Sequence, residues 1–102
     1  MWAVLKFKTN SFSILKEDLN KKLGKDFKIY IPKMRIQKYK NNKLITKDLN
    51  LLGDYIFCYH KSLERKNIIN SLKFTRGLKY LLEGFVESQG EIEKFILKCK
   101  VS

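Results

Sequence analysis

The segment 51–59 constrains the fold of this chain most, because its second half alternates in the manner of a β-strand. In an extended chain the side chains of Tyr55, Phe57 and Tyr59 share one face, and the two residues between them share the other. A small domain is expected to bury one face of its sheet against helices. The aromatic face is therefore either that core or an exposed apolar patch of the kind that marks a partner site.

The apolar pattern elsewhere predicts further strands and three helices. Apolar residues at spacings of three and four, a polar cluster before them and Gly24 after them indicate the first helix. Strands are expected at residues 2–7, 27–31, 34–36 and 78–82, and helices at residues 12–23, 62–72 and 88–98. The order β-α-β-β-α-β-α predicts one α+β domain over residues 1–102, a ferredoxin-like α/β sandwich with an antiparallel sheet.

The segment 38–43 is predicted to form the tip of a protruding hairpin. Its two asparagines, Asn41 and Asn42, tolerate the positive φ that a tight turn requires. The flanking lysines need solvent, and residues 44–52 then return to the sheet. Pro32, just before this hairpin, favours an edge strand or a bend.

The net charge of +12 is unevenly distributed along the chain. Residues 1–50 carry 13 Lys and Arg against 4 Asp and Glu, whereas residues 51–102 carry 9 against 6. This asymmetry indicates a polyanionic partner, with nucleic acid ahead of a membrane, because no basic amphipathic helix or lipidation signal accompanies it. A genome-wide bias toward lysine codons explains part of the charge, but not the scarcity of acids in the first half.

Other classes of protein are disfavoured by what the sequence lacks. No apolar run approaches the roughly 20 residues that span a bilayer, and no signal-peptide pattern is present, so a cytoplasmic protein is expected. Cys58 and Cys99 fit reduced thiols. The single histidine, His60, is expected at the surface, and no cluster of ligands or of acids predicts a metal, a cofactor or a catalytic site. We therefore expect a monomeric protein that is not an enzyme.

Five motifs in register resemble the N-terminal domain of NusG-type transcription elongation factors, and together they cover essentially the whole chain. They are Trp2-Ala3-Val4-Leu5, Tyr30-Ile31-Pro32, the lysine-rich hairpin, Leu51-Leu52-Gly53-Asp54-Tyr55-Ile56-Phe57, which resembles the family's Phe-Pro-Gly-Tyr-hydrophobic-Phe signature, and Thr75-Arg76-Gly77-Leu78. The last two motifs look more like the specialised paralogues typified by RfaH than like the housekeeping factor.

The chain departs from the family pattern in two ways. Leu51 and Leu52 replace the usual Phe-Pro, and Asp54 is an extra residue before the tyrosine. The family normally adds a KOW β-barrel after a linker, and residues 1–102 contain no such domain. Coupling to the ribosome or to Rho, which the resemblance assigns to the KOW domain, is therefore not expected of these residues.

The resemblance implies that an apolar patch docks on the paired clamp helices of the largest RNA polymerase subunit. Carried over to this sequence, the RNA polymerase-binding residues are Leu52, Tyr55, Phe57, Phe85, Ile92 and Ile96. Aromatic anchors of this kind supply much of the energy of an interface. The alternative for Tyr55 and Phe57 is that they pack beneath the C-terminal helix as core, and apolar residues at helical spacing are more often core than surface.

The resemblance also implies weak contact with upstream or non-template DNA. The predicted nucleic-acid-binding residues are Lys8, Lys21, Lys38, Lys40, Lys43 and Arg76. Lysines neutralise phosphates without reading bases, and Tyr39 between two lysines is able to stack on an exposed base. For any single lysine, a solvated side chain is the alternative. Arg76 is able to clamp a phosphate, cap a helix or pair with Glu83.

Two functions follow as hypotheses. The first is a transcription elongation or antitermination factor domain that holds the polymerase clamp closed and suppresses pausing. The second is a basic RNA-binding or ribosome-associated module of the same fold, with Tyr55, Phe57 and Tyr59 stacking on bases. The partner of the aromatic face distinguishes the two, since it is a pair of apolar helices in the first case and unstacked bases in the second.

Overall fold

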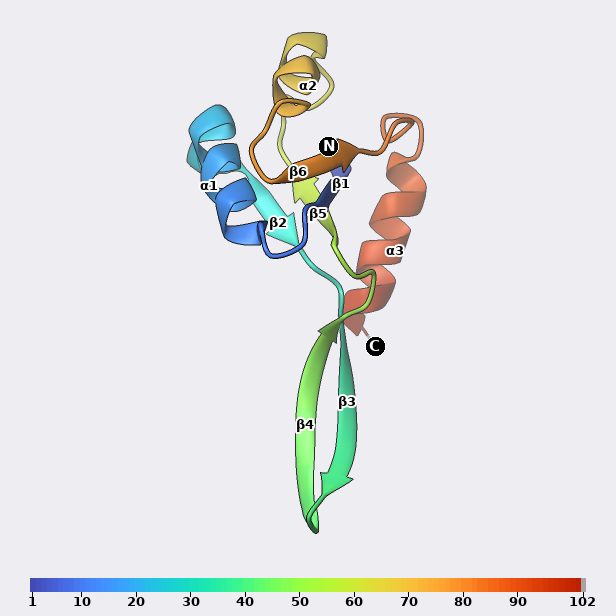
Figure 1. Cartoon of the computed structure of the whole chain (residues 1–102). Helices are drawn as coiled ribbons and strands as arrows, with labels where there is room; N and C mark the ends of the chain where they lie inside the picture. Colours follow the sequence, from blue (N-terminus) through green and yellow to red (C-terminus); the bar gives the residue numbers. More distant parts are fainter. Residues whose placement is uncertain (102) are drawn as a thin grey trace.

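The computed structural model describes residues 1–101, with side chains as far as Lys100, and it shows a mixed α+β architecture (Figure 1). This confirms the predicted α+β class. The elements along the chain are β1 (Trp2–Phe7), α1 (Phe12–Leu23), the short 3-10 helix η1 (Gly24–Asp26), β2 (Lys28–Tyr30), β3 (Lys33–Lys40), β4 (Lys43–Asn50), β5 (Tyr55–Tyr59), α2 (Lys66–Leu72), β6 (Leu78–Leu81) and α3 (Gln89–Val101).

The main sheet has four antiparallel strands in the order β2-β5-β1-β6. The central strand β1 buries Ala3, Leu5 and Phe7 on one face, because alternate residues of a strand point the same way. On β5, Ile56 and Cys58 point to this face and are fully buried. This face forms the main core of the domain.

Helix α1 packs on the core face of the sheet. Its residues Leu15, Leu19 and Leu23 are buried, as their spacing predicts. The ring of Phe12, at the start of the helix, lies 5.5 Å from the ring of Phe7 on β1. The helix ends where Gly24 adopts a φ of 75°.

Helix α3 covers the opposite, aromatic face (Figure 1). The ring of Phe95 on α3 lies 5.7 Å from that of Phe57. Gln89 accepts a hydrogen bond from the backbone N–H of Trp2 at 2.8 Å and donates one to its carbonyl at 2.6 Å. Near the other end of the helix, the ammonium group of Lys100 lies 5.2 Å from the ring of Tyr30. The expectation that the domain buries one sheet face is therefore wrong, because α1 packs on one face and α3 covers the other.

The segment between β5 and α2 also differs from the sequence expectation. His60 is 7 % exposed and its Nδ1 accepts a hydrogen bond from the backbone N–H of Ser62 at 3.0 Å. The predicted surface position of His60 is therefore wrong, because the chain folds back over this side chain. Helix α2 begins at Lys66, later than the start predicted at Ser62.

Strands β3 and β4 form a separate two-stranded sheet that projects from the domain as an arm (Figure 1). Asn41 and Asn42 adopt φ values of 53° and 63°, which confirms the predicted tight turn. At the base of the arm, the backbone N–H of Leu51 donates to the carbonyl of Pro32 at 2.8 Å. Because the arm projects from the domain, the molecule is elongated and measures 55 × 28 × 22 Å along its principal axes.

Within the described part of the chain, every helix is too short or too polar to cross a membrane.

Candidate docking and nucleic-acid surfaces

Four of the six residues predicted to bind RNA polymerase lie in the core. Their exposed fractions are 5 % for Phe57, 6 % for Phe85, 8 % for Ile92 and 4 % for Ile96. Helix α3 and the sheet bury these side chains against each other, which is the alternative that the sequence left open for Phe57. In this arrangement none of the four is available to a partner.

The other two predicted residues, Leu52 and Tyr55, remain accessible near the start of β5. Leu52 is 37 % exposed and its neighbour Leu51 is 43 % exposed. Tyr55 is half-buried, because helix α3 covers the sheet around Phe57 and leaves the end of β5 uncovered. The accessible part of the predicted surface is therefore this end of β5.

Two further side chains, Lys6 and Tyr80, adjoin Tyr55. Lys6 lies opposite Tyr55 in the pairing of β1 with β5 and opposite Tyr80 in the pairing of β1 with β6. The rings of the two tyrosines lie edge to face with centroids 6.1 Å apart, and their hydroxyl groups are hydrogen-bonded. The Lys6 ammonium group lies 5.0 Å from the Tyr55 centroid and 5.8 Å from the Tyr80 centroid, which is within the range of a cation–π contact.

A β-bulge brings Tyr80 to this cluster. Leu81 lies opposite Leu5 and Tyr80 opposite Lys6, but Phe7 lies opposite Leu78, so Lys79 is the extra residue. Without the bulge, Tyr80 would lie opposite Leu5 and point to the core face. Sequence analysis missed Tyr80 because a bulge leaves no mark in a short apolar strand.

We call Lys6, Leu52, Tyr55, Tyr80 and Leu82 the docking patch. Leu82 follows Tyr80 by two residues, its backbone N–H donates to the carbonyl of Val4 at 3.0 Å, and its side chain is 38 % exposed. The hydrogen bond between the Tyr80 and Tyr55 hydroxyl groups is the largest cause that raises the pKa of Tyr80 above its usual value, followed by desolvation. The patch therefore presents two phenol groups and apolar side chains around one ammonium group.

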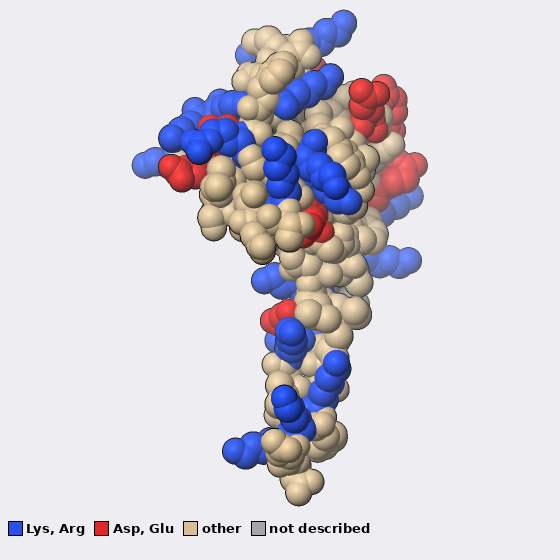
Figure 2. Space-filling model, viewed as in Figure 1, with Lys and Arg blue, Asp and Glu red and all other residues tan. Residues whose placement is uncertain are grey.

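The six predicted nucleic-acid-binding residues fall into two groups. Lys38, Lys40 and Lys43 lie on the arm, where Figure 2 shows basic side chains along its length. In the domain body, the backbone N–H of Lys8 donates to the carbonyl of Gly77 at 2.8 Å, which brings Lys8 next to the Arg76 turn. Lys21 is on α1 and forms an exposed ion pair with Glu17 at 3.7 Å.

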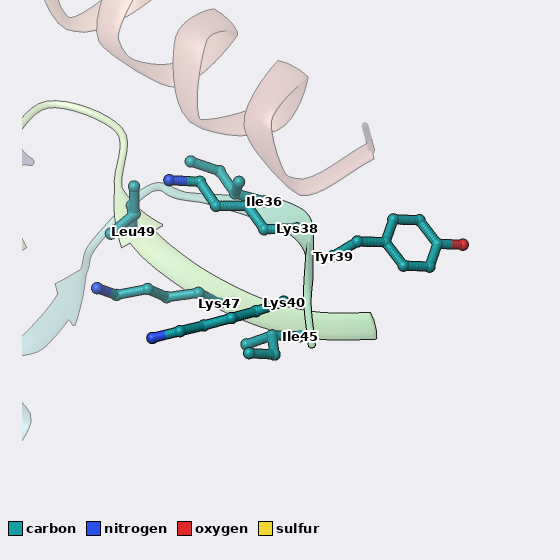
Figure 3. A pocket seen from close by; sticks show the side chains of 7 residues that line it. All are labelled: Ile36, Lys38, Tyr39, Lys40, Ile45, Lys47 and Leu49. Carbon is teal, nitrogen blue, oxygen red and sulfur yellow. The ribbon is translucent and has the colours of Figure 1, made fainter. Parts of the chain in front are cut away.

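One face of the arm combines basic and aliphatic side chains. The alternation of β3 and β4 puts on this face Met34, Ile36, Lys38, Lys40, Lys43, Ile45, Lys47 and Leu49. Several of them line a shallow hollow of about 260 Å³, shown in Figure 3. Tyr39 is 81 % exposed and points away from the others in Figure 3. The arm's ion pair, between Arg35 and Asp48 at 3.4 Å, lies on its other face.

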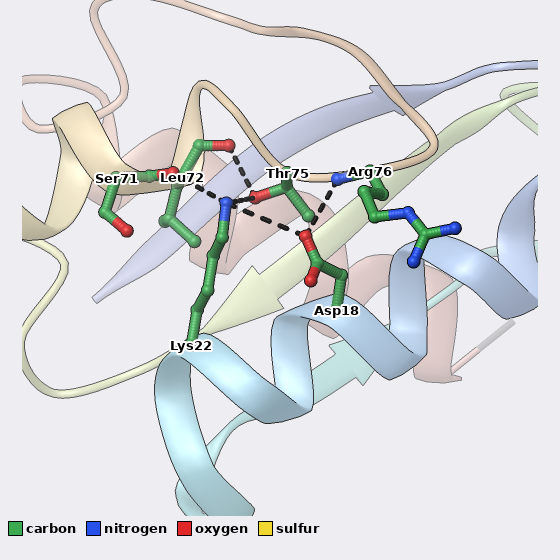
Figure 4. A network of polar contacts seen from close by, with 6 residues as sticks. All are labelled: Asp18, Lys22, Ser71, Leu72, Thr75 and Arg76. Carbon is green, nitrogen blue, oxygen red and sulfur yellow. Dashed lines mark hydrogen bonds and ion pairs between the residues drawn. The ribbon is translucent and has the colours of Figure 1, made fainter.

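A polar network holds the turn that carries Arg76 (Figure 4). The carboxylate of Asp18 on α1 accepts the backbone N–H of Arg76 at 2.8 Å and lies 3.6 Å from the ammonium group of Lys22. Lys22 also donates to the carbonyl of Ser71 at 2.9 Å. The guanidinium group of Arg76 forms no ion pair within residues 1–101, so it does not pair with Glu83.

The described residues hold no cluster of histidine, cysteine and acidic side chains that would bind a metal ion. Cys58 is fully buried, and desolvation raises the pKa of its thiol to about 12. A thiol that stays protonated is a poor nucleophile. Its place in the core makes Cys58 a structural residue.

Two surfaces therefore combine exposure with a definite chemistry, the docking patch beside β5 and the basic face of the arm. The first is apolar and aromatic around one cation, and the second alternates lysines with aliphatic side chains. A search of protein-family models found no match to this chain, and a search of curated proteins found no significant match either.

Proposed function

We propose that this chain is a NusG-like transcription elongation or antitermination domain, closest to the RfaH-like paralogues, that docks on RNA polymerase and modulates pausing. The five motifs in register support the family. The strand order β2-β5-β1-β6, with α1 and α2 each joining two strands that do not pair, supports the finer assignment of a ferredoxin-like sandwich.

The observation that carries the proposal is the exposed apolar and aromatic surface at the start of β5. Leu51, Leu52 and Tyr55 lie together in the segment that resembles the family signature, and the two leucines are 43 % and 37 % exposed. Adjacent exposed apolar side chains of this kind favour a protein partner. A partner that buries them gains about 25 cal/mol for each Å² of apolar surface removed from water.

The proposed mechanism is differential binding. The domain binds the clamp helices of the polymerase more tightly when the clamp is closed, and it therefore shifts the population away from the open, paused state. A tenfold preference for the closed clamp corresponds to about 1.4 kcal/mol. The domain itself performs no chemistry.

The cationic groups assist by holding nearby DNA. The arm carries three of the predicted lysines outward from the body, and the Arg76 turn carries a guanidinium group that forms no ion pair within residues 1–101. Contacts of this type add affinity that depends on salt and read no sequence. They would keep the domain oriented on the transcribing complex.

The RNA-module alternative has less support. It needs Tyr55, Phe57 and Tyr59 to stack on bases, and helix α3 covers this face, with Phe57 only 5 % exposed. Bases stack on aromatic side chains that are open to solvent. Stacking on this sheet face would require α3 to leave it.

The test is binding of purified RNA polymerase by the wild type, Tyr55→Ala and Leu52→Ala, with Tyr39→Ala as the control. Tyr39→Ala removes the same side chain at the far end of the arm. We expect the first two variants to lose about tenfold or more in affinity and the control to bind as the wild type does. Circular dichroism checks that each variant is folded. A wild type that does not bind polymerase, or equal losses in all three variants, would refute the proposal.

A further inference from the structure

The docking patch contains a cation that the domain leaves without an acid. Lys6 is half-buried near the end of β1, and it forms no ion pair in the part of the chain that the structure describes. Its ammonium group instead lies over the rings of Tyr55 and Tyr80. These contacts orient the ammonium group at the surface without neutralising its charge.

The backbone is arranged to complete this cluster. The bulge at Lys79 turns Tyr80 to the face that carries Lys6 and Tyr55. Bulges commonly re-aim a side chain at a functional site. The hydroxyl groups of the two tyrosines share one hydrogen bond, so one of their two O–H groups still has a proton to donate. The cluster therefore offers an ammonium group and a phenol to one acceptor.

A purely apolar partner would fit this patch poorly. Covering Leu52, Tyr55 and Leu82 would remove water from Lys6 as well, and an unpaired charge in a dry interface is strongly unfavourable. A carboxylate on the partner would remove this penalty and form a hydrogen bond assisted by charge. The chemistry of the patch thus selects an acidic group among apolar side chains.

A nucleic-acid base is a less suitable occupant. Bases stack on the open faces of aromatic rings. Here the two rings contact each other edge to face, and the Lys6 ammonium group lies over both of them. The neighbouring exposed side chains, Leu52 and Leu82, are aliphatic.

We propose that the Lys6–Tyr55–Tyr80 cluster binds a carboxylate that the docking partner presents among apolar side chains. This inference rests on the proposed function in one respect, since RNA polymerase would then be the partner that supplies the acid. The cluster would set the register of docking, because only one orientation of the partner places its carboxylate at Lys6.

The first test is the affinity of RNA polymerase for the wild type, Lys6→Met and Lys79→Met. Methionine keeps an apolar stem at Lys6 and removes the charge, and Lys79→Met removes the same charge from the bulge on the neighbouring strand. We expect Lys6→Met to weaken binding about tenfold. The control should stay within about twofold of the wild type, because a rim charge contributes little.

The direction of the change in polymerase affinity in Lys6→Met distinguishes an acidic partner group from a purely apolar one. If the partner offers only apolar groups, removing the charge relieves a desolvation cost and binding becomes tighter. Unchanged or tighter binding by Lys6→Met, together with a loss in Tyr55→Ala, would overturn the carboxylate inference and leave the proposed function standing. A wild type that fails to bind polymerase would instead count against the proposed function.

A second measurement tests the inference without polymerase. Two synthetic amphipathic helical peptides, identical except for a Glu or a Gln in the centre of a leucine face, are titrated into the labelled protein and followed by NMR shifts of β1 and β5. The Glu peptide should bind the wild type about tenfold more tightly, and the difference should vanish in Lys6→Met. Equal affinity for both peptides, or no binding of either, would overturn the inference.

Discussion

At the scale of single residues, the turn before β6 requires a glycine at position 77. Gly77 adopts a φ of +81°, and a Cβ atom there would lie 2.8 Å from the carbonyl oxygen of Ser11 and 3.0 Å from the backbone nitrogen of Leu15. The first turn of α1 therefore packs directly on this residue. Only glycine meets both requirements, the positive φ and the close approach.

We expect Gly77→Ala to be strongly destabilising and Gly53→Ala to be mildly so. Gly53 also has a positive φ, of +65°, but a Cβ atom there would meet nothing within 4 Å. The Gly53 variant should lose about 1 kcal/mol for its backbone conformation. The Gly77 variant should lose about 3 kcal/mol, because the helix backbone must also move. Urea unfolding followed by circular dichroism measures the free energy of unfolding of both variants. Equal losses would show that α1 moves away from a Cβ atom at residue 77 without cost.

Asp18 is a second residue whose role can be tested, through pH. The hydrogen bond from the backbone N–H of Arg76 is the largest cause that lowers the pKa of Asp18, and Lys22 adds to the shift. A carboxylate with a lowered pKa contributes stability above its unfolded pKa of about 3.9. This contribution is lost as the pH falls through the folded value.

The prediction is that Asp18→Ala lowers the melting temperature at about pH 7 and has a much smaller effect at about pH 3. Glu17→Ala is the control, because the Glu17 side chain is 72 % exposed and its carboxylate pairs only with Lys21, at 3.7 Å. The control should change little at either pH. Thermal melts across this range provide the measurement, and a loss for Asp18→Ala that does not depend on pH would contradict the role of its charge.

At the scale of elements, the arm is the part that a domain of this size does not need for its core. The face that carries its lysines also carries aliphatic side chains, of which Met34, Ile45 and Leu49 are 43 %, 45 % and 37 % exposed. An isolated two-stranded hairpin is only marginally stable in water. Stability of the hairpin therefore does not explain its length and composition, which fit the DNA contact proposed above.

The separation of the cations into two groups allows a matched experiment with two triple variants. One is Lys38→Gln/Lys40→Gln/Lys43→Gln on the arm, and the other is Lys8→Gln/Lys21→Gln/Arg76→Gln on the body. If the arm carries the DNA contacts, the first variant should reduce the slope of log K against log salt by about 2 for single-stranded DNA. The second should reduce it less, because Lys21 is already paired with Glu17. Unchanged slopes in the arm variant would exclude these lysines from the contact.

At the scale of the whole molecule, local pattern predicts the elements better than it predicts what covers them. The spacing of Leu15, Leu19 and Leu23 and the pair Asn41-Asn42 depend on short-range rules, and both features appear as expected. The apolar stripe of the last helix is equally clear, but spacing does not say whether it faces the sheet or a partner. The family resemblance assigns Ile92 and Ile96 to a docking surface, whereas the fold buries them, which is the commoner place for apolar residues at helical spacing.

The docking patch shows the same limit. The sequence could predict a binding role for Tyr55, because this residue lies in the segment that resembles the family signature. The sheet face on which Tyr80 lies depends instead on one extra residue, Lys79. The alternation of side chains along a strand predicts the sheet face of each residue only as far as the strand pairs without a bulge. The role proposed for Lys6 depends on Tyr55 and Tyr80, which only the pairing of the strands brings beside it.

The projecting arm also determines how the protein travels through a porous matrix. With axes of 55 × 28 × 22 Å, the molecule experiences more friction than a sphere of the same mass. A single copy should therefore leave a size-exclusion column early, at the volume of a larger compact protein. Elution volume then reports its shape, and light scattering, which weighs the particle directly, is the method that counts its subunits.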